Sequence, residues 1–428
     1  HMLGGRDLLL FSEGSVLVAS RGDNALTPAL EGGVKPVLAR GIGAVRPMAI
    51  DTAAVFVGAE GRSVRLLDAE YAETELSLAS EHLFRGRTVV DWAYAEAPWS
   101  LLWLAMSDGA MVVLSLLPRQ GVVGWTRAST GGAVGSLCAV SEGNEDALYL
   151  RTRRWLRGGW RYCVERLASR QVENVRDAYF LDCGLSLDDP RPIVALGLTD
   201  PGTITLSNYA LAAGDVFEID GTGIAEMDGR RFRALSSASN APVTVGVTDL
   251  EAEEPEVDWS TIGPWQGGGV LRKTVAAVGG LDHLAGESVM VLNDGSVEGP
   301  YTVGEDGMVT LERRGARVHA GLAYRSEGET LDVPEGADGG GRRKRVTSLH
   351  LRVRDTRGLK VGPVSGPLDT FKPRTVEAWG EPTRLRTELV ELPVTPEWGL
   401  GGRLRFVQDM PLPAELISLS PQFERSSE

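Results

Sequence analysis

Few residues of this sequence have the spacing that a reactive centre requires. The five histidines are widely separated, and neither an HExxH motif nor a Cys/His pair with metal-ligand spacing is present. The sequence also lacks a GxSxG nucleophile elbow and a GxxxxGK[ST] phosphate loop. The three cysteines, Cys138, Cys163 and Cys183, form no CxxC pair, and we interpret them as reduced thiols. The sequence predicts no catalytic residue, metal site or cofactor, although a triad or carboxylate pair assembled only in space stays open.

Charge gives one candidate interaction site. The 428 residues carry a net charge of −14, which excludes a generic nucleic-acid coat or a polybasic membrane binder. Within this acidic chain, residues 342–360 hold eight basic residues against one acid. The patch begins with Arg342, Arg343, Lys344 and Arg345, which could contact phosphates or an acidic partner. A solvated hairpin with a basic outer face explains the same pattern.

The sequence predicts that the elements that position these residues are β-strands. Glycine, at 53 residues, and proline, at 22, punctuate short runs rich in Val, Leu, Thr and aromatic residues. Similar segments begin at Val45, Val89 and Val134, which are 44 and 45 residues apart. Each holds several strands and a tight turn, namely Glu60-Gly61, Asp108-Gly109 or Gly158-Gly159. This period is typical of a β-propeller blade, and a β-sandwich meander is the alternative.

The spacing of the sequence repeat is lost near residue 190, which suggests that the chain has four regions. We predict an all-β fold with propeller-like blades over 1–191 and an inserted small β-barrel over 192–250. An acidic, Gly-rich linker follows over 251–272, and further blades over 273–428 return to the propeller. Ten tryptophans, including Trp155 and Trp160, are interpreted mainly as core between blades, with exposed ones serving as interface anchors.

A set of turn and core residues, in a fixed order, resembles the tail nozzle or tail-tubular (hub) proteins of short-tailed bacteriophages and prophages. The resemblance runs from about residue 80 to residue 420. Ile224 departs from it, because a methionine is expected there. The residues that carry it most clearly are Trp103, Asp108, Gly109, Trp125, Gly131, Tyr162, Glu165, Gly214, Asp215, Asp294 and Gly295.

The resemblance implies a non-catalytic structural protein of the virion tail, made in the cytoplasm of the bacterial host. Such proteins form homo-oligomeric rings, commonly sixfold, below the portal and adaptor, and they also contact fibre or tip proteins. They form the conduit for DNA ejection, so DNA would pass without sequence recognition and no stable membrane insertion is expected.

Two other functions fit the same residues. A β module that binds a host-surface glycan is the main alternative, and a propeller glycoside hydrolase is a further one. Fold alone does not distinguish these functions, since barrels and propellers host many unrelated sites.

Overall fold

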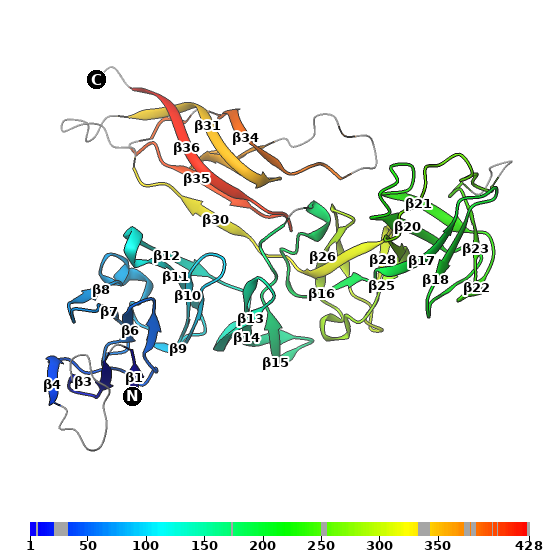
Figure 1. The fold of residues 1–428 in the computed structure, drawn as a ribbon. Coiled ribbons are helices and arrows are strands. Elements are labelled where there is room, and N and C mark those ends of the chain that lie inside the picture. Colours follow the sequence, from blue (N-terminus) through cyan, green and yellow to red (C-terminus); the bar gives the residue numbers. More distant parts are fainter. Residues whose placement is uncertain are drawn as a thin grey trace. The chain divides into compact units, whose positions relative to one another are not determined.

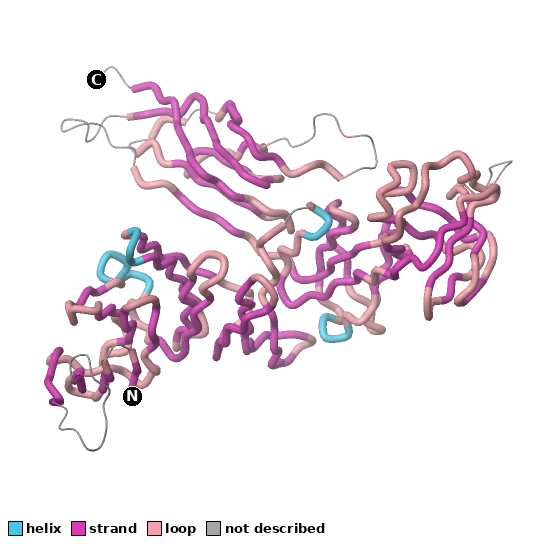
Figure 2. The backbone as a smooth tube through the Cα atoms, viewed as in Figure 1, coloured by secondary structure: helices cyan, strands magenta, loops and turns pink. Residues whose placement is uncertain are grey.

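The regular secondary structure of the protein is almost entirely β-strand (Figure 2). The computed structural model describes residues 1–5, 7–20, 33–172, 174–249, 255–332, 343–371, 377, 382–395, 397–399 and 401–425. Its helices there are short 3₁₀ turns at Leu78–Leu83, Pro118–Gln120, Val175–Asp177 and Asp282–Leu284. The predicted all-β class is therefore confirmed. The chain divides into two compact units, His1–Ser169 and Arg170–Glu428, and each is described by itself.

The first unit consists of four antiparallel sheets, each formed by strands that are consecutive in the sequence (Figure 1). Short hairpin connections favour this arrangement because neighbouring strands can pair at once. The first sheet contains β1 (Met2–Gly4), β2 (Leu8–Phe11), β3 (Val16–Ser20) and β4 (Gly33–Leu38). The second contains β5 (Met48–Ile50), β6 (Ala53–Val57), β7 (Val64–Leu67) and β8 (Glu73–Glu75). The third contains β9 (Val89–Ala95), β10 (Leu101–Met106), β11 (Met111–Leu117) and β12 (Val122–Ala128). The fourth contains β13 (Ala133–Glu142), β14 (Glu145–Leu156) and β15 (Gly159–Arg166).

The four sheets are stacked face to face, with an apolar cluster between each pair. Alternate residues of a strand point to opposite faces. On β6, Phe56 packs with Phe11 of the first sheet, whereas Val57 packs with Leu104 of the third. Trp103 of β10 then packs with residues of the fourth sheet. All five residues of β6 are buried because both faces of its sheet are covered.

The sequence repeat corresponds to these sheets. The repeats that begin at Val45, Val89 and Val134 contain the second, third and fourth sheets, respectively. Their predicted turns connect β6 with β7, β10 with β11, and β14 with β15.

The turns also join one sheet to the next. The Val89 amide donates to the Gly61 carbonyl at 2.8 Å, and the Val134 amide donates to the Gly109 carbonyl at 2.8 Å. Both glycines have positive φ angles, 74° and 87°, at which a side chain would be strained. The same turn therefore bonds the second sheet to the third and the third to the fourth.

A closed six-stranded barrel lies in the second unit. Its strands, in spatial order, are β17 (Arg191–Gly197), β18 (Thr203–Leu206), β23 (Val243–Gly246), β21 (Arg230–Ala234), β20 (Val216–Asp220) and β24 (Val270–Lys273). Strands β19 (Ala210–Leu211) and β22 (Ala238–Ser239) form a small extra pair. The barrel thus extends beyond the predicted range of 192–250, because its closing strand β24 falls at the end of the predicted linker of 251–272.

The barrel is inserted between two strands of other sheets. Before it, β16 (Asp182–Asp188) joins β29 (Arg317–Leu322), β26 (Ser288–Asn293) and β27 (Ser296–Thr302) in one sheet. After it, β25 (Val275–Val278) pairs with β28 (Val309–Gly315).

The C-terminal part of the second unit has two sheets around one apolar core. The first contains β30 (Ser326–Glu329), β35 (Leu404–Gln408), β32 (Lys360–Pro363) and β33 (Asp369–Thr370). The second contains β34 (Arg386–Pro393), β31 (Lys344–Thr356) and β36 (Glu415–Arg425). Leu351 of β31 and Val361 of β32 belong to the shared core. These strands are not paired in sequence order, which differs from the consecutive order in the first unit and from the further blades predicted over 273–428.

None of the helices in the described residues is long and apolar enough to cross a membrane.

Candidate interaction surface

The outer side of the fourth sheet exposes a row of aromatic, apolar and basic side chains. Strands β14 and β15 pair so that Arg151 is opposite Val164, Arg153 opposite Tyr162, and Trp155 opposite Trp160. Trp155 is 58% exposed, Trp160 55%, Tyr162 67% and Val164 80%. Aromatic residues and arginine are enriched at the centres of protein interfaces. We call these six residues the terminal face.

Direct contacts order the aromatic side chains of the terminal face. Trp155 and Trp160 meet edge to face, with ring centroids 5.3 Å apart. The guanidinium carbon of Arg153 lies 4.5 Å from the centroid of the Trp160 ring. Each contact favours one orientation of the side chains, so the hairpin presents a preformed surface.

The inner side of the same hairpin contains a buried ion pair. Arg154 is 2% exposed, and its Nε lies 2.6 Å from the Glu165 carboxylate. Arg154 also donates to the backbone carbonyl and to the hydroxyl of Thr130, which precedes the positive-φ residue Gly131. Arg154 thus links the predicted residue Glu165 to Thr130, the neighbour of the predicted residue Gly131.

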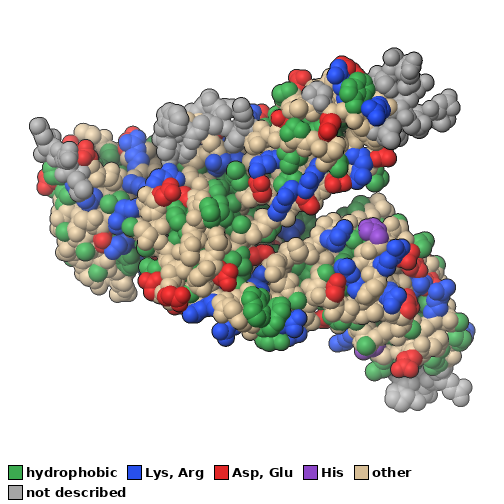
Figure 3. Space-filling model, turned by 180° about the vertical axis from the view of Figure 1, so that it is seen from behind, with side chains coloured by type: hydrophobic (Ala, Val, Ile, Leu, Met, Phe, Trp, Pro, Cys, Tyr) green, Lys and Arg blue, Asp and Glu red, His purple; other side chains and the backbone are tan. Residues whose placement is uncertain are grey.

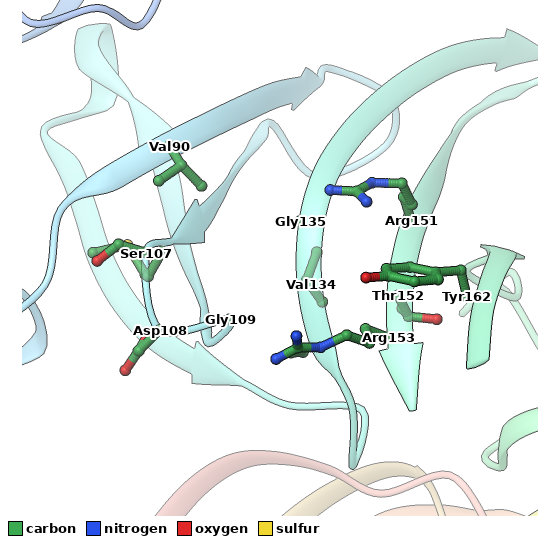
Figure 4. Close-up of a pocket in the computed structure, with 12 residues that line it drawn as sticks. Val90, Ser107, Asp108, Gly109, Val134, Gly135, Arg151, Thr152, Arg153 and Tyr162 are labelled. Carbon is green, nitrogen blue, oxygen red and sulfur yellow. The ribbon is translucent and has the colours of Figure 1, made fainter. Parts of the chain in front are cut away.

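A pocket of about 240 Å³ is lined by residues of the third and fourth sheets, among them Arg151, Arg153 and Tyr162 of the terminal face (Figure 4). Arg151 and Arg153 extend into it from β14, and Tyr162 of β15 lies between them. The turn with Ser107, Asp108 and Gly109 forms the opposite wall, and Val90, Met106, Val134 and Gly135 complete the lining together with Ala133 and Thr152. The predicted residues Asp108, Gly109 and Tyr162 are therefore brought together, although their sequence positions gave no sign of a shared pocket.

Asp108 does not neutralise the two arginines of the pocket. Its carboxylate lies 3.3 Å from Nε of Arg87 and accepts a hydrogen bond from the Ala110 amide at 3.1 Å. Among the residues that the structure describes, no carboxylate lies within ion-pair distance of Arg151 or Arg153.

In the second unit, Asp294 of the Asp294-Gly295 turn binds residues from distant segments of the chain. Asp294 accepts from the amides of Ala316, at 3.0 Å, and Arg317, at 2.8 Å, and forms ion pairs with Arg176 and Arg231. Arg231 belongs to barrel strand β21, so the turn bonds the barrel to the sheet from which it emerges. A β-carbon at Gly295 would lie 2.7 Å from Cγ1 of Val175, so this position is closely packed as well.

Buried charges surround this turn. Burial raises the pKa of Glu218, although a hydrogen bond and ion pair with Arg176 partly offset that effect. Burial also opposes the charge of Arg176, but its bonds to Glu218 and Asp294 outweigh burial and raise its pKa. The ion pair with Arg176 thus counteracts the cost of burying the Glu218 carboxylate.

His319 is the buried titratable group beside this network. Its Nδ1 lies 2.7 Å from the Ser186 hydroxyl and its Nε2 lies 2.9 Å from the Arg176 carbonyl. Burial lowers the pKa of His319, and the hydrogen bond to the carbonyl offsets this only in part.

The remaining predicted residues in the repeat and the barrel have structural positions. Trp103 is 3% exposed, and Trp125 donates its indole hydrogen to the Leu76 carbonyl at 2.8 Å. Asp215, which follows Gly214, accepts from the Ala212 amide at 2.9 Å and lies 2.8 Å from Nζ of Lys273. Burial alone would raise the pKa of Asp215, but these two partners outweigh burial and lower it.

The predicted basic patch is largely engaged within its own sheets. Arg342 lies outside the described residues, and Arg343 is exposed. Lys344 is 4% exposed, and its backbone pairs with Gly399. Arg345 bonds Glu424 and lies over the Trp398 ring, 5.1 Å from its centroid. Acidic and basic side chains are also interspersed over the molecular face in Figure 3.

A run of consecutive basic residues does not mark the two arginines of the pocket. The signal was present as alternation, since Arg151 and Arg153 are two positions apart and must share a face of a strand.

A scan against models of known protein families finds no match to this chain, and a search of curated proteins finds none that is similar.

Proposed function

We propose that this protein is a non-catalytic structural component of a short-tailed phage tail, in which sheet stacking closes a β-propeller or a ring around the DNA path. The ordered motifs described above suggest the tail context. The observation that best supports the proposal is that, among the described residues, both ends of the stack of four sheets in the first unit carry apolar side chains that are exposed or half-buried.

At one end, the outer side of the first sheet carries half-buried and exposed apolar residues. Leu9 and Phe11 of β2 face the core, so the alternating residues Leu8 and Leu10, which are half-buried, face away from it. Val34 of β4 is 55% exposed. At the other end lies the terminal face.

Two different apolar ends favour head-to-tail association. Contacts between unlike surfaces form a ring when the rotation from one element to the next closes. The inner sheets show how such a contact is made, because each buries both faces against its neighbours. We infer that these ends are covered in the same way, by other copies or by neighbouring tail proteins. A sixfold ring of this kind would suit a conduit below a portal.

The test is the solution mass of the full chain, measured by light scattering at increasing concentration and with candidate neighbouring tail proteins. Assembly into a closed multiple of the protomer mass is expected. Val164→Glu, which places a charge in the terminal face, should abolish it. Leu78→Glu is the matched control, because Leu78 is 73% exposed outside both ends of the stack. A protein that stays monomeric under every condition contradicts the proposal.

Exposed tryptophans on the barrel would favour a glycan-binding module instead. Trp259 is 1% exposed in the barrel core, and Trp265 is half-buried, with its indole nitrogen 3.1 Å from the Gly268 carbonyl. Neither offers the open aromatic platform that a sugar ring needs, so we propose no second function.

A further inference from the structure

We propose that the pocket formed by Arg151, Arg153 and Tyr162 is a binding site for a phosphate group. This inference goes beyond the structural role proposed above, and because these three residues also belong to the terminal face, it concerns the protomer before that face is covered. It follows from the charge of the pocket, from the way its side chains are held, and from the size of the space between them.

The charge of the pocket is unusual for this protein. Arg154, the residue that follows Arg153, is buried against Glu165. Arg151 and Arg153 face the other way, and among the described residues neither has a carboxylate partner. Asp108 is the acidic residue of the lining, and Arg87 already pairs with it. The pocket therefore holds excess positive charge in a chain whose net charge is −14.

The two guanidinium groups are held apart by packing. The ring of Trp160 orients Arg153, as described above. Nε of Arg151 lies 3.4 Å from the Ser136 hydroxyl, and its guanidinium carbon lies 5.9 Å from the Tyr162 ring centroid. Both groups point toward the same space, with the phenol of Tyr162 between them (Figure 4). Preformed donors lose less freedom when they bind a ligand.

Gly135 makes room for the Arg151 side chain. A β-carbon at this position would lie 2.2 Å from Nη2 of Arg151. The strand pairing shifts between Val134 and Ser136, so Gly135 lies in a bulge of β13. Bulges re-aim neighbouring side chains. Here the bulge and the missing side chain let the guanidinium lie against the backbone at the pocket wall.

This arrangement suits a phosphate better than a single carboxylate. The planar donor fork of arginine matches the oxygens of either anion. Two forks supply two positive charges, which balance a phosphate dianion but exceed one carboxylate. The hydroxyls of Tyr162 and Ser107 add possible donors, and Met106 and Val134 can contact a small group attached to the phosphate. The volume of about 240 Å³ accommodates a phosphate with a sugar-sized substituent. Such a group could belong to a free phosphate ester or to the backbone of DNA.

Calorimetric titration of the full chain with inorganic phosphate, at constant ionic strength, tests the proposal. Saturable binding is expected, with the dissociation constant raised about tenfold or more by Arg151→Ala or Arg153→Ala, because each removes one charge-assisted partner. Arg161→Ala is the matched control, since Arg161 is an exposed arginine of the same hairpin on the opposite side from Tyr162. Its dissociation constant should not change.

Gly135→Ala tests the geometry without removing a charge. The added methyl group meets the end of a flexible side chain, so the fold should be retained while Arg151 is displaced. We expect weaker phosphate binding with an unchanged melting temperature.

Two further probes separate the sources of the phosphate. Binding of adenosine monophosphate, with the same sensitivity to the arginine variants, would indicate a phosphate ester. Binding of a twelve-base-pair DNA duplex with that sensitivity would indicate the nucleic-acid backbone. Absence of saturable binding by all three probes, or an equal loss in Arg161→Ala, overturns the proposal. The proposal is also overturned if polyglutamate displaces phosphate and binds more tightly, because the pocket would then bind the carboxylates of a protein.

Discussion

Substitution of the turn glycines should separate backbone strain from the contact between neighbouring sheets. Gly158, Gly61 and Gly109 all have positive φ angles, so alanine at each costs about 1–2 kcal/mol in backbone strain. At Gly158 the new β-carbon meets nothing within 4 Å. At Gly61 it would lie 3.1 Å from the Thr88 side chain, and at Gly109 it would lie 2.5 Å from Cβ of Ala133 and 2.9 Å from its Cα. Overlap with an adjacent sheet adds about 1–3 kcal/mol.

The expected order of destabilisation is therefore Gly158→Ala, then Gly61→Ala, then Gly109→Ala, with a total of about 2–5 kcal/mol for the last. Hydrogen exchange of peptides covering β13 measures this locally, because the Val134 amide donates to the Gly109 carbonyl. Each 1.4 kcal/mol corresponds to about tenfold faster exchange. Exchange in Gly109→Ala that is no faster than in Gly158→Ala would show that the turn does not support the next sheet.

Three further predictions concern buried charges. Glu165→Gln should lower the free energy of unfolding, measured in urea, by about 3–5 kcal/mol, because it removes the carboxylate that pairs with the buried Arg154. Glu142→Gln should lower the free energy of unfolding by less, because its partner Arg166 is 35% exposed. Equal losses in the two variants would contradict this reasoning. Asp294→Asn should accelerate hydrogen exchange in barrel strands β20 and β21, because it weakens the ion pairs with Arg176 and Arg231. Asp306→Asn, in the Asp306-Gly307 turn between β27 and β28, should leave exchange in β20 and β21 unchanged. Because the pKa of His319 is lowered in the folded protein, the unfolded state binds its proton first, and stability should fall as the pH drops below about 6.5. His319→Gln should reduce that dependence and His82→Gln, an exposed position, should not; an unchanged slope in His319→Gln would refute the assignment.

Local sequence patterns predicted the elements of the first unit well. Alternation and turn chemistry are local, so Asp108-Gly109 marked a hairpin between β10 and β11. The repeat starting at Val89 coincides with β9 for the same reason. The barrel was also detected, but its closing strand was not. Val270–Lys273 is only four residues long and follows a glycine run, so it becomes a strand only by pairing with distant partners.

The pocket and the charged turn depended on contacts that sequence does not reveal. Asp294 was predicted as a turn residue, yet its ion-pair partners Arg176 and Arg231 are 118 and 63 positions away. Arg151 and Tyr162 likewise line one pocket with Ser107 only after two sheets have stacked. A run of adjacent basic residues is visible in a sequence, but on a strand its members point to opposite faces.

The pairing of the first and last strands of the barrel affects how the gene for such a chain can evolve. Arg191 is opposite Leu271 and Pro192 is opposite Val270, so the chain enters and leaves the barrel at one place. Replacing everything between those points by a short turn would leave the flanking β16 and β25 within reach of each other. A single deletion or exchange in the gene could thus remove or replace the whole module. The exchange would be constrained at Asp188 and Asp294, whose partners Arg272 and Arg231 would leave with the barrel.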